Sequence, residues 1–108
     1  MNYKINLVPS FKKDVKKLSK KYKHIKQDLL ILKELFISTK PDKVGISLGK
    51  NCYKIRIKNS DNKKGKNSGY RVIYFYLDKD VVTLLSIYSK SEIQNISDLE
   101  ISKRLEEL

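Results

Sequence analysis

The sequence predicts a single α+β domain in which helices pack against one face of an antiparallel sheet. Its 108 residues are the usual length of one domain. Alternating hydrophobic and polar residues indicate strands at the start and in the second half of the chain, and a 3.6-residue periodicity indicates helices between and after them. The expected domain spans residues 1–108. Its order is an N-terminal strand, an α-helical hairpin, a three-stranded antiparallel meander that completes a four-stranded sheet, and a short C-terminal helix.

The first third of the chain predicts one strand and two helices. Residues 2–8 alternate between hydrophobic and polar side chains, and Pro9 ends this strand. Ser10 is the expected N-cap of a helix. A second helix from about His24 to Ser38 follows a tight link, so that the two helices form an antiparallel hairpin. The hydrophobic side of the first helix holds Phe11, Val15, Leu18 and Tyr22. Its opposite side holds the lysines Lys12, Lys13, Lys16, Lys17, Lys20 and Lys21.

The rest of the chain predicts the meander and the last helix. Residues 39–50 carry Pro and Gly turn signals and are expected to form a loop. Two alternating strands follow at residues 51–58 and 68–76, joined by a polar loop. A nearly continuous hydrophobic strand then runs over residues 81–88, which favours a covered position in the sheet. Ser91 is a possible N-cap for a C-terminal helix, whose hydrophobic positions are Leu99, Leu105 and Leu108.

The composition indicates which partners and which cellular compartment to expect. The chain has 24 Lys and Arg against 12 Asp and Glu, a formal net charge of +12, which is typical of proteins that bind nucleic acid. A lysine-rich solvated surface is the alternative interpretation. No hydrophobic run reaches the ~18 residues of a membrane span and the N-terminus lacks a signal-peptide core, so we expect a cytoplasmic protein with no membrane partner. The single Cys52 has no nearby base in the sequence and is expected in the core.

One strand and one arginine predict an anion site. Alternate residues of strand 51–58 share a face, about 7 Å apart. One face of this strand can join the core, and the other presents cations. Arg71 stands between hydrophobic neighbours in the next strand, where a charge is costly unless an anion needs it. In strand 51–58 the core-facing side holds Tyr53, Ile55 and Ile57. The cationic side holds Lys54, Arg56 and Lys58.

Three segments carry a family resemblance: Cys52-Tyr53-Lys54-Ile55-Arg56, Gly69-Tyr70-Arg71-Val72-Ile73-Tyr74 and Ile87-Tyr88-Ser89-Lys90-Ser91-Glu92. Preceded by a strand and a basic helical hairpin, they resemble the RelE/ParE superfamily of bacterial toxins, especially its RelE-like and HigB-like branches. The resemblance covers essentially the whole chain. It implies the RelE-like fold and a toxin of a type II toxin–antitoxin system. For RelE-like members it implies a ribosome-dependent mRNA endoribonuclease, or mRNA interferase, that inhibits translation.

The resemblance also implies partners and roles. The partners are a cognate antitoxin encoded by an adjacent gene, the ribosomal A site and mRNA, with no metal and no small-molecule cofactor. Cleavage is a transesterification in which a ribose 2′-OH attacks the neighbouring phosphate. Arg56 and Arg71 are expected to clamp that phosphate, because a guanidinium cannot act as a base at neutral pH. Lys54 is either a base or a third clamp, and Lys90 lies where the family often has a basic residue. Tyr88 is a candidate for base stacking or proton transfer.

The chain departs from the family at its C-terminal end. RelE-like enzymes commonly carry a catalytic tyrosine where this chain reads Ile96-Ser97-Asp98, and Ser91 stands where an arginine often occurs. These departures shift the expected proton-transfer role toward Tyr88. Sequence-independent contacts to the RNA backbone are expected from lysines of the strand, the loop and the first helix: Lys58, Lys63, Lys64, Lys66, Lys16 and Lys20.

Two alternative functions stay open at this point. One is a ParE-like poison of DNA gyrase, which is not a nuclease. ParE-like chains typically do not keep the full set of Lys54, Arg56 and Arg71, so these residues favour the nuclease. The other alternative is a non-catalytic RNA-binding module of the same fold.

Overall fold

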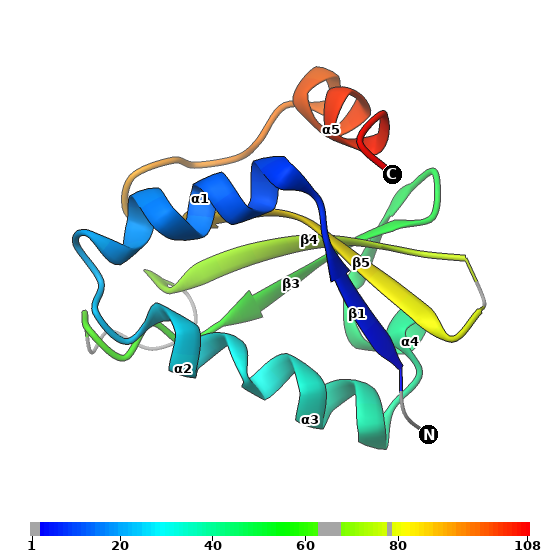
Figure 1. Ribbon diagram of the computed structural model, residues 1–108, viewed down its shortest axis with the longest axis horizontal. Coiled ribbons are helices and arrows are strands. Elements are labelled where there is room, and N and C mark those ends of the chain that lie inside the picture. Colours follow the sequence, from blue (N-terminus) through cyan, green and yellow to red (C-terminus); the bar gives the residue numbers. More distant parts are fainter. Residues whose placement is uncertain (1–2, 63–67, 78) are drawn as a thin grey trace.

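The computed structural model describes residues 3–62, 68–77 and 79–108, and it has a five-stranded sheet with helices around it (Figure 1). The strand order is β1-β5-β4-β3-β2, with β1 parallel to β5 and all other pairs antiparallel. The predicted α+β class, meander and short C-terminal helix are confirmed. In chain order the elements are β1 (Lys4–Leu7), α1 (Pro9–Ser19), α2 (Ile25–Leu29), α3 (Ile31–Ser38), α4 (Pro41–Val44), β2 (Ile46–Gly49), β3 (Cys52–Ile57), β4 (Tyr70–Tyr76), β5 (Val81–Ser89) and α5 (Asp98–Leu105).

The prediction of a four-stranded sheet is wrong by one strand. The expected loop 39–50 contains the short helix α4 and the edge strand β2, which pairs with β3 so that Ile46 lies opposite Lys54. The turn between the two strands has positive φ at Gly49, Lys50 and Asn51 (86°, 53° and 60°). The glycine and proline signals in this stretch therefore mark a tight hairpin and a helix start, and all four residues of β2 are exposed.

Three helix boundaries also differ from the prediction. The helix α1 begins at Pro9 with Val8 as its N-cap, so Ser10 is already inside the helix. The second helix is interrupted at Leu30, whose N–H bonds Gln27 O three residues back, and it becomes α2 and α3. The helix α5 is capped by Ser97, whose hydroxyl accepts the N–H of Glu100 at 3.1 Å, and not by Ser91. The longest helix has 11 residues, and no helix within the described part of the chain is long and apolar enough to cross a membrane.

Aromatic side chains of β4 join the sheet to the helical layer. Tyr70 meets Tyr22 edge-to-face at 5.7 Å between ring centroids, and Tyr74 meets Phe36 at 5.2 Å. Tyr53 of β3 stacks on Tyr74 at 5.5 Å, so it points to the same side. Because side chains alternate along a strand, the face of the sheet that carries these aromatic rings is the helix side, and the residues between them lie on the opposite face.

The edge of β5 is completed by side chains instead of by a strand. The strand β1 pairs with β5 only as far as Leu84, and α1 lies beside the rest of β5. There Asp14 accepts the N–H of Ile87 at 3.2 Å, and Arg104 Nη1 donates to Leu85 O at 2.9 Å. Arg104 also pairs with Asp14, with 3.2 Å between Nη2 and Oδ1. The Asp14–Arg104 clasp therefore satisfies backbone groups that would otherwise be unpaired, and it fastens α5 to α1.

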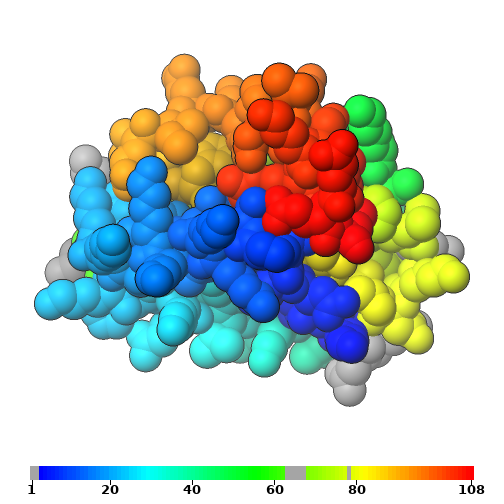
Figure 2. All heavy atoms as spheres, turned by 45° about the horizontal axis from the view of Figure 1, so that its top comes forward, coloured from blue at the N-terminus to red at the C-terminus, as the bar shows by residue number. Residues whose placement is uncertain are grey.

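A second contact fastens the C-terminus to the start of α1. The carboxylate of Glu107 accepts the backbone N–H of Ser10 at 2.8 Å and also the Ser10 hydroxyl. Figure 2 shows the C-terminal residues lying directly against the first turn of α1. Glu107 thus does for α1 what a side-chain N-cap normally does, because an anion is stabilised at a helix N-terminus. The hydrogen bond from the Ser10 side chain, followed by that from its backbone, lowers the pKa of Glu107.

We predict that Arg104→Ala destabilises the protein by about 1–3 kcal/mol, because it leaves Asp14 and the carbonyl of Leu85 without their donor in a largely buried site. The measurement is the urea midpoint of unfolding. Lys103→Ala is the matched control, since Lys103 is the preceding residue of α5 and is exposed. Equal losses in the two variants would show that the Asp14–Arg104 clasp does not hold α5.

We predict a pH dependence for the contact between Glu107 and Ser10. The pKa of Glu107 is lowered in the folded protein from its ordinary value of 4.5, so the contact stabilises fully above that pH. The stabilisation is lost as the pH falls through the lower, folded-state pKa. The stability difference between wild type and Glu107→Gln should therefore be largest at neutral pH and shrink in acid. A difference that stays constant from pH 7 to about pH 3 would contradict this.

Candidate functional site

Four predicted residues meet on the sheet face opposite the helical layer. In the strand register, Arg56 of β3 lies opposite Arg71 of β4, and Arg71 lies opposite Tyr88 of β5. Lys54 lies opposite Ile73, one step along the same face. Residues directly opposite on neighbouring strands point to the same side at about 5 Å separation. We call this arrangement of Lys54, Arg56, Arg71 and Tyr88 the cationic face.

The cationic face has a buried floor and an open rim. Arg71 and Tyr88 are only 5% and 4% exposed, whereas Arg56 is exposed and Lys54 is half-buried. Arg71 Nη1 donates a long hydrogen bond of 3.4 Å to Tyr70 O. Burial, followed by the charge of Arg56, lowers the pKa of Arg71. Arginine nevertheless stays charged at neutral pH, so the site places a desolvated cation beneath an exposed one.

Tyr88 supplies a protonated hydroxyl beside Arg71. Its hydroxyl is buried, and no group in the described residues makes a hydrogen bond of normal geometry to it. Burial raises the pKa of Tyr88, and the backbone of Ile96 and the charge of Arg71 only partly offset this effect. The phenol therefore holds its proton at neutral pH, which suits a group that donates to an incoming ligand.

The C-terminal segment borders the cationic face. Lys54 Nζ donates to Asn95 Oδ1 at 3.4 Å, and Lys50 Nζ donates to Ser102 Oγ at 3.3 Å. A hollow of about 400 Å³ lies between Tyr88 and the residues from Ile93 to Arg104. Sequence reasoning did not single out Asn95, because a polar residue in an irregular segment carries no local signal of its distant partner.

The other predicted residues lie outside the set of four that defines the cationic face. Lys90 closes a turn after β5, where its N–H bonds Gly69 O at 2.9 Å and its ammonium bonds Gln94 O at 2.7 Å. Lys58 is exposed just after β3. Lys16 and Lys20 are exposed on and just after α1, in the helical layer and not on the cationic face. The loop residues Lys63, Lys64 and Lys66 lie outside the described residues.

The start of the basic loop is attached to α2. Asp61 accepts the N–H of His24 at 2.9 Å and contacts His24 Nδ1 at 2.7 Å. Asp28 accepts both the N–H and the hydroxyl of Ser60, at 3.0 and 3.1 Å. The hydrogen bonds from His24 lower the pKa of Asp61. These pairs hold the chain that leaves β3, so the loop begins from a defined position next to the sheet.

Gly69 sets the approach of β4 to β3 at the other end of that loop. A Cβ at position 69 would lie 2.2 Å from the backbone oxygen of Ile57, far inside contact distance. Only glycine allows the two strands to come this close immediately before Tyr70 and Arg71. No group of three or more His, Cys, Asp and Glu residues placed to hold a metal occurs in the parts of the chain that the structure describes.

The comparisons with known proteins identify the fold. No protein-family model matches the chain, and no curated protein matches it. Among solved structures, the chain is similar to the E. coli toxin RelE, in a double arginine-to-alanine mutant in the free state. The TM-score is 0.58 at 22% identity, and the alignment covers 98% of this chain and 97% of that one. The predicted RelE-like fold is therefore confirmed over essentially the whole length of the chain.

Proposed function

We propose that this protein is the toxin of a type II toxin–antitoxin pair and that its cationic face cleaves mRNA on the ribosome. The observation that carries the proposal is the single row of Arg56, Arg71 and Tyr88 across three strands, with Lys54 beside it. The likeness to RelE supports the same function through the fold. The net charge of +12 favours a partner rich in phosphate.

The two arginines would stabilise the reacting phosphate. In the proposed reaction the ribose 2′-oxygen forms a bond to phosphorus while the bond to the 5′-oxygen breaks, leaving a 2′,3′-cyclic phosphate. Negative charge grows on the phosphoryl oxygens in the transition state. Arg71 is held in a desolvated position where its charge acts strongly, and exposed Arg56 can meet the substrate first.

Two protons must move in this reaction, and the site offers a group for each. Tyr88 retains its proton and can donate it to the leaving 5′-oxygen. Lys54 is held by Asn95 at the rim. It would act on the attacking 2′-OH, either as the base or as a further cation on the phosphate. No metal or cofactor is needed for these steps.

A protein of this activity requires a neutralising partner. We propose that an antitoxin encoded by an adjacent gene supplies an acidic segment, disordered until bound, that covers the cationic face in the cytoplasm. The Asp14–Arg104 clasp and the Glu107 contact make displacement of α5 costly. Direct coverage of Arg56 and Lys54 is therefore the favoured way to neutralise the site.

The deciding experiment is single-turnover cleavage of ribosome-bound mRNA. Arg71→Ala should reduce the rate about 10²–10³-fold, because it removes one electrostatic contact to the transition state. Lys43→Ala, which removes an exposed cation from α4, is the control and should cleave like wild type. Wild-type cleavage by Arg71→Ala would contradict the assigned site.

The same variants, induced in bacteria, separate the alternatives. Primer extension on cellular mRNA should show cleavage with wild type and none with Arg71→Ala. DNA damage without mRNA cleavage would instead indicate a gyrase poison. Growth without arrest, together with RNA binding in vitro, would indicate a non-catalytic RNA-binding module.

A further inference from the structure

The segment that leads from the end of β5 to α5 crosses the cationic face (orange in Figure 1). Its residue Asn95 contacts Lys54 of β3, and the backbone of Ile96 lies beside the hydroxyl of Tyr88 of β5. In the sheet, β4 lies between β3 and β5, so the segment reaches across β4 on this side. We call residues 93–97 the strap.

The strap lies over the floor of the cationic face. Arg71 and Tyr88 point to this side of the sheet, yet they are only 5% and 4% exposed. Three strap residues line the hollow beside Tyr88, namely Ile93, Asn95 and Ile96. A phosphate that contacts both Arg71 and Tyr88 needs the space above them. The strap must therefore move before these two groups can act on a substrate.

Both ends of the strap are fixed. Just before it, the carboxylate of Glu92 accepts the hydroxyl of Tyr22 at 3.0 Å. At its other end, Ser97 caps α5, which the Asp14–Arg104 clasp fastens to α1. Movement is therefore confined to the residues between these anchors, and α5 can stay in place while the strap opens.

Two lysine ammonium groups hold the middle of the strap. Lys90 Nζ donates to the backbone oxygen of Gln94 at 2.7 Å, and Lys54 Nζ donates to Asn95 Oδ1 at 3.4 Å. The side chains of Gln94 and Asn95 are exposed, and Ile93 is 50% exposed. Because these residues bury little apolar surface, the contacts with the two lysines are what resists opening.

We propose that the strap closes the cationic face of the free protein and that an RNA phosphate opens it by taking over Lys54 and Lys90. An ammonium group bonds more strongly to a phosphate oxygen than to a neutral amide oxygen, because both partners of the first contact are charged. The two lysines would therefore exchange the strap for the phosphate. Arg71 and Tyr88 become accessible in the same step. The inference rests on the proposed function for the identity of the anion.

The closed strap separates a first contact from a productive one. Arg56 is exposed beside the strap, so it can meet a phosphate while Arg71 and Tyr88 are still covered. The apparent affinity for phosphate is then lower than that of the open face, in proportion to the fraction of molecules that are open. Weakening the strap should therefore strengthen binding, whereas removing a true phosphate contact should weaken it.

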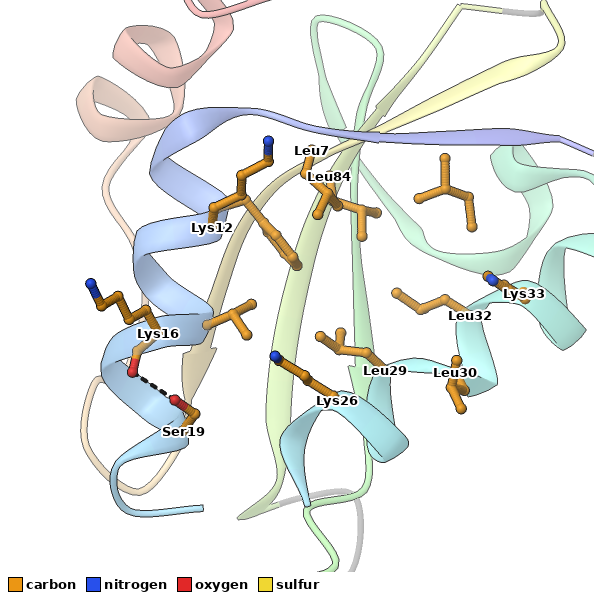
Figure 3. Close-up of a pocket in the computed structure, with 13 residues that line it drawn as sticks. Leu7, Lys12, Lys16, Ser19, Lys26, Leu29, Leu30, Leu32, Lys33 and Leu84 are labelled. Carbon is orange, nitrogen blue, oxygen red and sulfur yellow. Dashed lines mark hydrogen bonds between the residues drawn. The ribbon is translucent and has the colours of Figure 1, made fainter. Parts of the chain in front are cut away.

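The helical layer takes no part in this movement. It contains an apolar hollow of about 590 Å³ between α1 and α2–α3, with Leu7 and Leu84 between the two walls (Figure 3). The described residues that line this hollow lie between Ile5 and Lys33 or at Leu84. Opening of the strap therefore changes the cationic face and leaves the other side of the sheet as it is.

The test measures binding of a deoxydinucleotide, which has one phosphate and lacks the 2′-hydroxyl that cleavage requires. Asn95→Ala removes the acceptor of Lys54, so the affinity measured by NMR titration should rise about two- to fivefold. Gln94→Ala is the matched control. Gln94 contacts Lys90 through its backbone oxygen, which the substitution keeps, so this variant should bind the probe like wild type.

Hydroxyl-radical footprinting of the free variants measures opening without any ligand. Labelling of Tyr88 should rise in Asn95→Ala and stay at the wild-type level in Gln94→Ala. Tyr70, which is fully buried on the helix side of the sheet, is the internal control and should be labelled equally in all three proteins.

Several results would overturn the inference. Weaker binding by Asn95→Ala would make Asn95 a phosphate contact instead of part of a closing strap. Unchanged affinity or unchanged labelling of Tyr88 in Asn95→Ala, equal gains in Gln94→Ala, and no binding by any variant at millimolar concentration would each do the same. The expected pattern together with uncleaved ribosome-bound mRNA would count against the proposed function alone, so the two failures are distinguishable.

Discussion

The Asp14–Arg104 clasp is the interaction on which the arrangement of the C-terminal half depends. The strand β1 is too short to cover β5 beyond Leu84, so the backbone groups of Leu85 and Ile87 would face the helical layer without partners. One carboxylate and one guanidinium, with side chains 20% and 13% exposed, satisfy both groups and each other. The next residue along β5 is Tyr88. The contact that completes the edge of the sheet therefore lies next to the cationic face, and it fastens the helix that borders this face.

The alternation of side chains along β3 and β4 places the core residues on one face of the sheet and the cationic face on the other. Tyr70 and Tyr74 face the helices and build the core, which leaves Arg71 on the opposite face by strand geometry alone. There it stands directly opposite Arg56, and like charges across a strand pair are destabilising. In the reaction proposed above, the two arginines already stand where the phosphate would bind, so little reorganisation would be needed as charge develops in the transition state.

Much of the fold could be predicted from local patterns. Period-two alternation correctly separated the core residues of β3 from Lys54 and Arg56, and the helical periodicity located α1 and the α2–α3 segment. The chain order of these elements was sufficient for the α+β class and for the meander. The break at Leu30 and the strand β2 were missed. The helix break depends on one hydrogen bond, from the N–H of Leu30 to the carbonyl of Gln27 three residues earlier. The strand β2 has only four residues and forms only because β3 provides its partner.

The sequence by itself determined which side chains share a strand face and the net charge of +12, because alternation and composition can be read without the fold. Only the tertiary structure decided that Arg56, Arg71 and Tyr88 stand in one row, since the register between strands comes from packing and not from spacing along the chain. It also decided the pairing of Asp14 with Arg104, 90 residues apart. Neither residue has a neighbour in sequence that signals the other. Their partnership exists because an unfinished sheet edge, a helix and the C-terminal segment meet at one point.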